Sequence, residues 1–299
     1  MNIYSAISSN KNKTWAIMLL FVLIITTIVY VFSKALGYGI GFAGIALIIA
    51  GVTSIGSYYY SDKIVLASSG AQEIKKEDNP ELFRIVENLC IGDGLPAPKI
   101  YIINDASPNA FATGRDPKHA VVCVTTGILS ILDKSELEGV IAHELSHVKN
   151  YDIRLMGIVA VLVGFMAILS NLFTNQLLFG GLNKRDNERN NLNGIFMIIG
   201  IILAILSPIA ATLIQLAISR KREFLADASG VLLTRYPDGL ASALEKLENN
   251  KNSLKSASNA TAHLFIVNPF KGKETKQFFT SLFDTHPPIE ERIKILREM

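Results

Sequence analysis

Long apolar stretches alternate with polar segments along this chain. The four longest apolar stretches run over residues 15–32, 38–58, 155–173 and 195–218. Each approaches the roughly 20 residues that an α-helix needs to cross a bilayer. The pattern therefore predicts about four transmembrane helices, arranged as an N-terminal hairpin and a second hairpin further along the chain.

Between and after the hairpins, the spacing of apolar residues is typical of a folded unit in water. Asn79 and Pro80 predict the start of a helix, as its N-cap and its first residue. Residues 99–103 and 120–125 predict two strands, and residues 107–114 between them predict a turn-rich loop. The apolar face of the first helix is expected to contain Leu82, Ile85, Val86 and Leu89.

The C-terminal part predicts two further helices, one after residues 237–239 and one over residues 288–299, with a flexible loop at 249–261. The expected fold class is α+β: a mainly helical integral membrane protein with a cytoplasmic domain that contains a small β-sheet. Four parts are expected, namely a membrane hairpin at 1–60, the first part of the domain at 61–153, a second membrane hairpin at 154–218 and the second part of the domain at 219–299.

Composition supports this division. The 299 residues are 49% hydrophobic and 18% charged, with a mean hydropathy of +0.33. This is too apolar for an ordinary soluble domain and too charged for a pure membrane bundle. The net charge of +3 is small and the basic residues form no stripe with aromatics, which argues against nucleic-acid binding.

Two features bear on orientation and compartment. Basic residues near the span ends gather on one side, which predicts that this side is cytoplasmic. Cys90 and Cys123 show no metal-type spacing and are expected to be reduced core thiols, with a disulfide left open. The larger basic group, on the side predicted to be cytoplasmic, comprises Lys11, Lys13, Lys63, Lys149, Arg154, Arg220, Lys221 and Arg222. The smaller group, on the other side, comprises Lys34, Lys184, Arg185 and Arg189.

Residues 143–147 carry the motif His-Glu-x-x-His in a stretch that a helix can span without interruption. Ser135 and Glu138 predict a capping box just upstream. His143 and His147, four residues apart, share one helix face and can bind the same Zn²⁺ ion. Glu144 lies on the same side, where it can act as a general base toward a metal-activated water. The motif predicts a zinc peptidase.

A catalytic zinc site takes three protein ligands and keeps one open position. In one zincin class the third ligand is a His in HExxHxxGxxH, but Asn150 and Ile153 stand at the corresponding positions. Glu223, on a later helix, offers a carboxylate instead. Asp227, one turn further, would face the same way and could accept the free ring N–H of a ligand His.

Two other functions compete with this interpretation. An intramembrane protease would place the motif inside a span and use an Asp, such as Asp238, as third ligand. The polar residues at 149–154 argue against that, because they suit a bilayer core poorly. A non-enzymatic chaperone or metal carrier is the second alternative, and chelator-sensitive peptide hydrolysis would separate it from an enzyme.

The ordered motifs resemble the HtpX-type membrane zinc metalloproteases, relatives of the CAAX prenyl proteases. The resemblance rests on HELSHVKNYD at 143–152, REFLADA at 222–228 and THPPIEERI at 285–293, with residues 79–82 and 108–114 in support. It covers almost the whole chain and is weakest over 249–284.

The resemblance implies a membrane endopeptidase with one Zn²⁺ per chain, held by His143, His147 and Glu223, and with Glu144 as general base. It further implies a multi-pass protein of the bacterial cytoplasmic (inner) membrane, whose active site faces the cytoplasm. The implied task is quality control and stress response, with misfolded or damaged membrane proteins and unfolded peptides as substrates.

Several residues are candidates for substrate contacts. The strand at 120–125 is expected at a sheet edge, where a peptide could add as a strand beside Val122 and Val124; the alternative is ordinary core. Asn109 and Phe111 are candidates for the cleft, although Asn109 is equally a turn residue. His286, before Pro287, is a candidate donor to the developing oxyanion or simply a helix-entry residue. Arg292 either pairs with a carboxylate near the site or lies on the surface.

Overall fold

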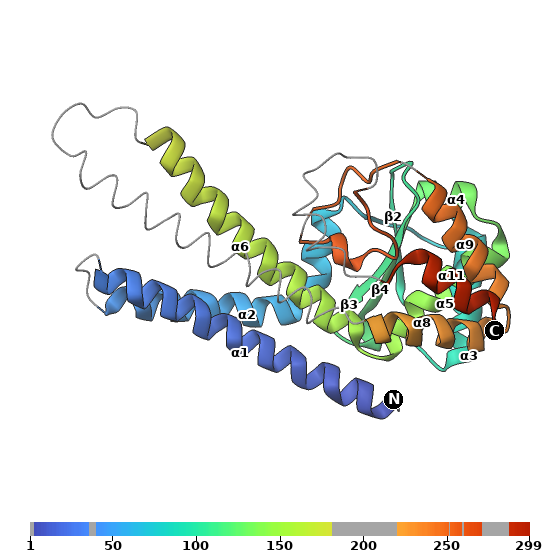
Figure 1. Ribbon diagram of the computed structural model, residues 1–299, viewed down its shortest axis with the longest axis horizontal. Helices are drawn as coiled ribbons and strands as arrows, with labels where there is room; N and C mark the ends of the chain where they lie inside the picture. The colour runs from blue at the N-terminus through green and yellow to red at the C-terminus, as the bar shows by residue number, and fades with distance from the viewer. Residues whose placement is uncertain (1–2, 36–39, 181–219, 251, 259, 271–286) are drawn as a thin grey trace.

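A computed structural model describes residues 3–35, 40–180, 220–250, 252–258, 260–270 and 287–299 (Figure 1). Two long helices, α1 (Ile3–Ala35) and α2 (Gly41–Ser68), pack against each other and extend away from a globular domain. Both are long and apolar enough to cross a membrane, α1 over Ile7–Tyr30 and α2 over its full length. Helix α1 contains the first predicted stretch, and α2 contains the second from residue 41 onward and continues past the boundary expected at residue 60.

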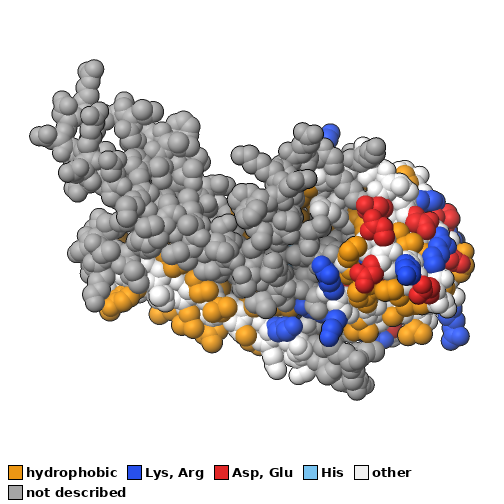
Figure 2. Space-filling model, viewed as in Figure 1, with side chains coloured by type: hydrophobic (Ala, Val, Ile, Leu, Met, Phe, Trp, Pro, Cys, Tyr) orange, Lys and Arg blue, Asp and Glu red, His pale blue; other side chains and the backbone are white. Residues whose placement is uncertain are grey.

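Helix α6 (Asp152–Gly180) contains the third predicted stretch and packs along α1 and α2. The pair formed by α6 and the preceding helix α5 (Lys134–Lys149) is long and apolar enough for a further span, but the two helices are bent by 83° relative to each other. The fourth predicted stretch, 195–218, lies outside the described residues. Large apolar side chains such as Leu19 and Leu23 are exposed on α1, whereas charged side chains gather over the globular domain (Figure 2).

The domain contains a four-stranded sheet with the order β1-β2-β4-β3. Strands β2 and β4 are parallel, and the β1–β2 and β3–β4 pairs are antiparallel. The strands are β1 (Gln72–Glu73), β2 (Lys99–Ile103), β3 (Ala110–Gly114) and β4 (Ala120–Thr125). The sequence correctly predicted β2 and β4.

Two predictions about this sheet were wrong. The segment 107–114 was expected to be a loop, but its second half forms β3. Strand β4 was expected at an edge, but it pairs with β2 on one side and β3 on the other. Because its main-chain groups are used in both ladders, β4 cannot accept a further strand; β3 is the edge strand on this side of the described sheet.

Helices cover the faces of the sheet (Figure 1). In addition to α5 and α6, the domain contains α3 (Pro80–Asp93), α4 (Thr126–Ile131), α8 (Arg220–Thr234), α9 (Pro237–Asn249), α11 (Ile289–Arg297) and the short helices η1 (Pro117–His119) and η2 (Ala262–Leu264). Asn79 caps α3 as predicted, accepting a hydrogen bond from the N–H of Leu82. Cys90 lies in the core on the α3 side and Cys123 in the core on the opposite face; both are free thiols.

Helix α5 begins earlier than the sequence suggested. Its capping box is formed by Asp133 and Glu136 and not by Ser135 and Glu138. The Asp133 side chain accepts from the N–H of Glu136 at 3.0 Å, and the Glu136 carboxylate accepts from the N–H of Asp133 at 2.8 Å. Asp caps a helix as well as Ser does, and both motifs have the same spacing, so the pattern alone did not distinguish them.

The corner between α5 and α6 contains one strained residue. Tyr151 has a φ of 60°, a left-handed conformation that costs a residue with a Cβ roughly 1–2 kcal/mol. It lies between Asn150, the last cap residue of α5, and Asp152, the first residue of α6. The chain direction changes by 83° at this corner, between α5 and α6.

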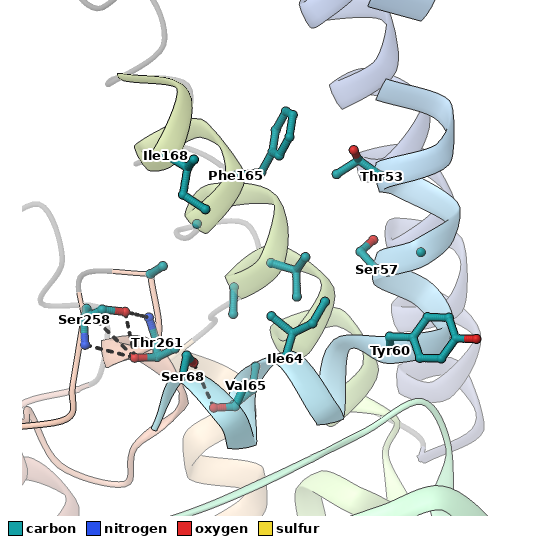
Figure 3. Close-up of a pocket in the computed structure, with 15 residues that line it drawn as sticks. Thr53, Ser57, Tyr60, Ile64, Val65, Ser68, Phe165, Ile168, Ser258 and Thr261 are labelled. Atoms are coloured by element: carbon teal, nitrogen blue, oxygen red, sulfur yellow. Dashed lines mark hydrogen bonds between the residues drawn. The ribbon is translucent and has the colours of Figure 1, made fainter. Parts of the chain in front are cut away.

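A cavity of about 550 Å³ lies between α2, α6 and the segment 258–261 (Figure 3). Its wall combines apolar side chains, such as Ile64 and Phe165, with hydroxyl groups, such as those of Ser57 and Thr261. It lies beside α2 and α6 and is not lined by the His-Glu-x-x-His residues.

Candidate metal centre

Three potential ligand side chains converge at the interface of α5 and α8. His143 and His147 lie one turn apart on α5, and Glu223 lies in the first turn of α8. The two Nε2 atoms are 3.2 Å apart, and they lie 3.7 Å and 3.6 Å from the nearer carboxylate oxygens of Glu223. A tetrahedral zinc ion with bonds of about 2.1 Å has donor–donor edges of about 3.4 Å. The donor set and its spacing therefore fit a single ion.

A glycine permits the close approach of the two helices. A Cβ on Gly230 of α8 would lie 3.2 Å from the backbone nitrogen of His143, which is tighter than ordinary packing. Helix α8 can thus lie directly against the metal-site turn of α5. The approach encloses the cluster, leaving His143, His147 and Glu223 at most 5% exposed.

Each imidazole is also held on its far side by a carboxylate. Nδ1 of His143 lies 2.9 Å from Asp227, and Nδ1 of His147 lies 3.0 Å from Asp152. A carboxylate in this position fixes the tautomer, so that Nε2 presents its lone pair to a metal. The sequence indicated Asp227 but missed Asp152. The available signal was an acid five residues after the second His, just past a helix end.

Arg292 of α11 is completely buried behind His143 and is not on the surface. Its guanidinium donates to both carboxylate oxygens of Asp227, at 2.8 Å and 2.6 Å. Burial alone would raise the pKa of Asp227, but the charge of Arg292 and the hydrogen bond from His143 lower it to about 2. Asp227 is therefore an anion that can accept the ring N–H across the neutral pH range.

Glu144 lies beside the cluster and is 2% exposed. Burial raises the pKa of its carboxyl group, while the neighbouring imidazoles and a hydrogen bond from the backbone N–H of Ala112 lower it in part. A general base works best when its pKa lies nearer to neutrality than that of an ordinary Glu. The contact also places this carboxylate against strand β3.

The structure does not place the predicted substrate residues in a cleft. Val122 and Val124 are fully buried in the core on the α5 side of the sheet. Phe111 is also fully buried and packs edge-on against Phe265. These side chains are core residues because β4 is a central strand and alternate residues of β3 face its two cores.

Asn109, also a candidate for substrate contact, is 1% exposed. Its amide donates to the carbonyl of Val267 at 3.0 Å and accepts from the N–H of Ala110 at 3.1 Å. Asn109 therefore links the segment around Val267 to the start of β3.

His286 lies outside the described residues. Asp238, the alternative third ligand, is half-exposed on α9 and pairs with Arg297, away from the cluster.

Comparisons with known proteins identify the family of this chain. Residues 76–299 match the model of peptidase family M48. The Protease HtpX homolog of Tropheryma whipplei is 48% identical over 296 residues, covering 99% of this chain and 98% of the relative. That of Dictyoglomus thermophilum is 47% identical over 298 residues, covering 99% and 94%.

Among solved structures, the crystal structure of S. mikatae Ste24p is similar, with a TM-score of 0.50 and 19% identity. The similarity covers 95% of this chain and 66% of that one, and at this identity it concerns the fold alone. The sequence relatives and the family match carry the assignment. The chain therefore belongs to peptidase family M48, and within it to the HtpX-like membrane-bound metalloproteases.

Proposed function

We propose that this metalloprotease is an endopeptidase in which His143, His147 and Glu223 hold one Zn²⁺ and Glu144 is the general base. The observation that carries the proposal is the cluster of donor atoms: the two Nε2 atoms lie 3.2 Å apart, His143 lies 3.7 Å from one carboxylate oxygen of Glu223 and His147 lies 3.6 Å from the other. Each imidazole is also backed by a carboxylate. When bound there, zinc supplies Lewis acidity, which acidifies water and polarises the scissile carbonyl.

The protein groups around the ion have separate tasks. Glu144 takes the proton from the attacking water and then delivers it to the leaving amine. Asp227 and Asp152 keep the two imidazoles in the metal-binding tautomer. Arg292 offsets the charge of Asp227, so that the carboxylate remains ionised although it is buried.

The substrate is proposed to bind along β3 and not along β4. The carbonyl of Ala110 points away from β4, because it accepts from the N–H of Ile266. The N–H of Ala112 points the same way and donates to Glu144. A peptide that extended the sheet at 112–114 would thus pass the general base. Recognition through main-chain groups needs little side-chain specificity, which suits unfolded segments.

The membrane arrangement is proposed to comprise four spans, with the active site on the cytoplasmic side of a bacterial inner membrane. The support is that α5 and α8, which flank residues 154–218, meet at one site. The intervening chain must leave and return on the same side, so 61–153 and 219–299 would form one protease domain. A compartment-sensitive reporter fused near residue 185 should be active outside the cytoplasm; cytoplasmic activity of that fusion would contradict full crossing.

This arrangement supports a role in membrane-protein quality control, with misfolded or damaged membrane proteins as substrates. An active site fixed beside its own membrane helices reaches segments close to the bilayer, and main-chain recognition requires that these segments be unfolded.

The proposed function is tested with the full chain purified in detergent. One zinc per chain by elemental analysis, and hydrolysis of unfolded casein that a chelator abolishes and zinc restores, are expected. Hydrolysis that survives complete metal removal would refute the zinc mechanism.

A further inference from the structure

The first membrane helix reaches the proposed metal site through one buried side chain, Asn10, which is 2% exposed. Its amide nitrogen donates to the Asp152 carboxylate at 2.7 Å and to the backbone carbonyl of Asn150 at 2.9 Å. Its amide oxygen accepts from the Arg222 guanidinium at 3.2 Å. One side chain of α1 thus connects the end of α5, the start of α6 and the start of α8.

The two groups to which Asn10 donates lie on either side of Tyr151, the residue with the left-handed backbone. A strained residue persists only where its surroundings over-determine its conformation. The Asn10 amide supplies such a constraint, because it binds both flanks of the corner at once. The same helix adds a second contact, with the ammonium of Lys11 4.4 Å from the centre of the Tyr151 ring.

The corner determines where Asp152 lies relative to the metal site. One of its carboxylate oxygens accepts from Asn10 and Arg222, and the other lies 3.0 Å from Nδ1 of His147. A buried carboxylate needs charge compensation and satisfied oxygens. Arg222 supplies the charge, while Asn10 fixes the direction in which the carboxylate points.

We infer that Asn10 is a positioning residue for the metal ligand His147, and that the first membrane helix thereby contributes to metal affinity as well as to anchoring. The inference rests on the proposed role of His147 as a ligand. Loss of the Asn10 amide frees the corner and the Asp152 carboxylate, so that the imidazole is no longer held in its metal-binding orientation. Losing the group bonded directly to a ligand, here Asp152, lowers metal affinity roughly 10–100-fold, so this range is the upper bound for loss of Asn10, which acts through Asp152.

The experiment uses the full chain in detergent micelles. Asn10→Leu keeps approximately the size of the side chain without its polar atoms, and Asn10→Ala truncates it; both variants remove all three hydrogen bonds. The matched control is Thr14→Val, one turn along α1. Thr14 is fully buried like Asn10, but its hydroxyl donates only to the backbone carbonyl of Asn10 within its own helix.

The Zn²⁺ dissociation constant is measured by competition with a chromophoric chelator, and the coordination geometry by the visible absorption of the Co²⁺-loaded protein. Melting of the metal-free proteins reports on packing. Both Asn10 variants are expected to bind Zn²⁺ more weakly, by at most roughly 10–100-fold, and to show altered Co²⁺ bands. Thr14→Val is expected to match the wild type in both measurements.

Unchanged Zn²⁺ affinity and Co²⁺ bands in the Asn10 variants, with a wild type that binds one zinc, would overturn this inference alone. So would an equal loss of affinity in Thr14→Val, because the effect would then be one of helix packing. A wild type that binds no zinc would overturn the proposed function, and this inference with it.

Discussion

His147 and Asp152 face each other across the corner between α5 and α6, with 3.0 Å between Nδ1 and the nearer carboxylate oxygen. His143 has the equivalent relationship with Asp227 at 2.9 Å. Asp152 lies only five residues after His147, at the start of the next helix, whereas Asp227 lies on α8, far from His143 along the chain. The site thus reaches the same local geometry in two ways.

Replacing Glu144 by Gln should leave zinc bound and remove hydrolysis. The amide keeps the shape of the side chain but cannot take a proton, and general-base catalysis typically contributes 10²–10⁴-fold. Cleavage of unfolded casein should therefore fall at least about 100-fold, with unchanged zinc content. Glu138→Gln is the control, because Glu138 lies on the same helix with a partly exposed side chain. Near-native cleavage by Glu144→Gln would show that another group is the base.

Replacing Arg292 by Met should strongly destabilise the protein. The substitution leaves the Asp227 carboxylate buried without its cation, and breaking a buried ion pair costs about 3–5 kcal/mol. The free energy of unfolding and the zinc content should both decrease. Arg297→Met on the same helix should cost at most about 1 kcal/mol, since its pairs with Asp238 and Glu245 are exposed. Equal losses in the two variants would argue against the structural role of Arg292.

The edge-strand proposal is tested by Ala112→Pro. Proline lacks the N–H that points toward Glu144, but it leaves the β3–β4 ladder intact because that N–H faces away from β4. KM should rise because a main-chain partner of the substrate is disturbed, and kcat should also fall because the same N–H donates to Glu144, with zinc still bound. Ala112→Ser keeps the N–H and should behave as the wild type. A proline variant with unchanged KM would show that the substrate does not use this edge.

The start of α5 offers a test of local stability. Asp133→Ala removes the N-cap hydrogen bond and should cost about 1 kcal/mol in the free energy of unfolding. Ser135→Ala, which removes the hydroxyl of the residue first predicted as the cap, should cost much less. Denaturant unfolding of the two variants measures the difference, and a larger cost for Ser135→Ala would reverse the assignment of the cap.

The two cysteines should be inert in the folded protein at pH 8. Burial, with a smaller contribution from the charge of Asp93, raises the pKa of Cys90 to about 11, and burial also raises the pKa of Cys123. A raised thiol pKa leaves the unreactive protonated form dominant at pH 8. Alkylation by iodoacetamide should be slow until the protein is unfolded in detergent and urea, when both thiols react. Rapid labelling of the folded chain would contradict their burial.

Local sequence signals predicted those parts of the fold that depend on nearby residues. Asn79 and Pro80 marked the start of α3, and the apolar runs marked β2 and β4. Strand β3 was missed because Ser107, Pro108 and Asn109 favour a turn, and the small residues after them become a strand only by pairing with β4. Sheet order depends on such distant pairing, so the position of β4 could not be predicted from its own residues.

The candidate site was predicted unevenly for a similar reason. The spacing within 143–147 and the acids at 223 and 227 follow helical geometry and can be seen in the sequence. The position of Asp152 depends on a left-handed backbone conformation at Tyr151, and a tyrosine in the sequence does not predict that conformation. In the sequence, Asn10 looks like an ordinary polar residue before an apolar span. Its contacts are with residues 150, 152 and 222, which are distant along the chain, so no local pattern predicts them.

Residues 154–218, proposed to form a second hairpin, separate the imidazoles of α5 from the carboxylate of α8 along the chain. During synthesis, a nascent polypeptide that ends before residue 223 would hold only two of the three proposed ligands. Arg292 emerges later still, close to the C-terminus. The order of translation would therefore postpone proteolytic competence until residues 154–218 and Glu223 have left the ribosome, which would protect the newly inserted chain and its neighbours from premature cleavage.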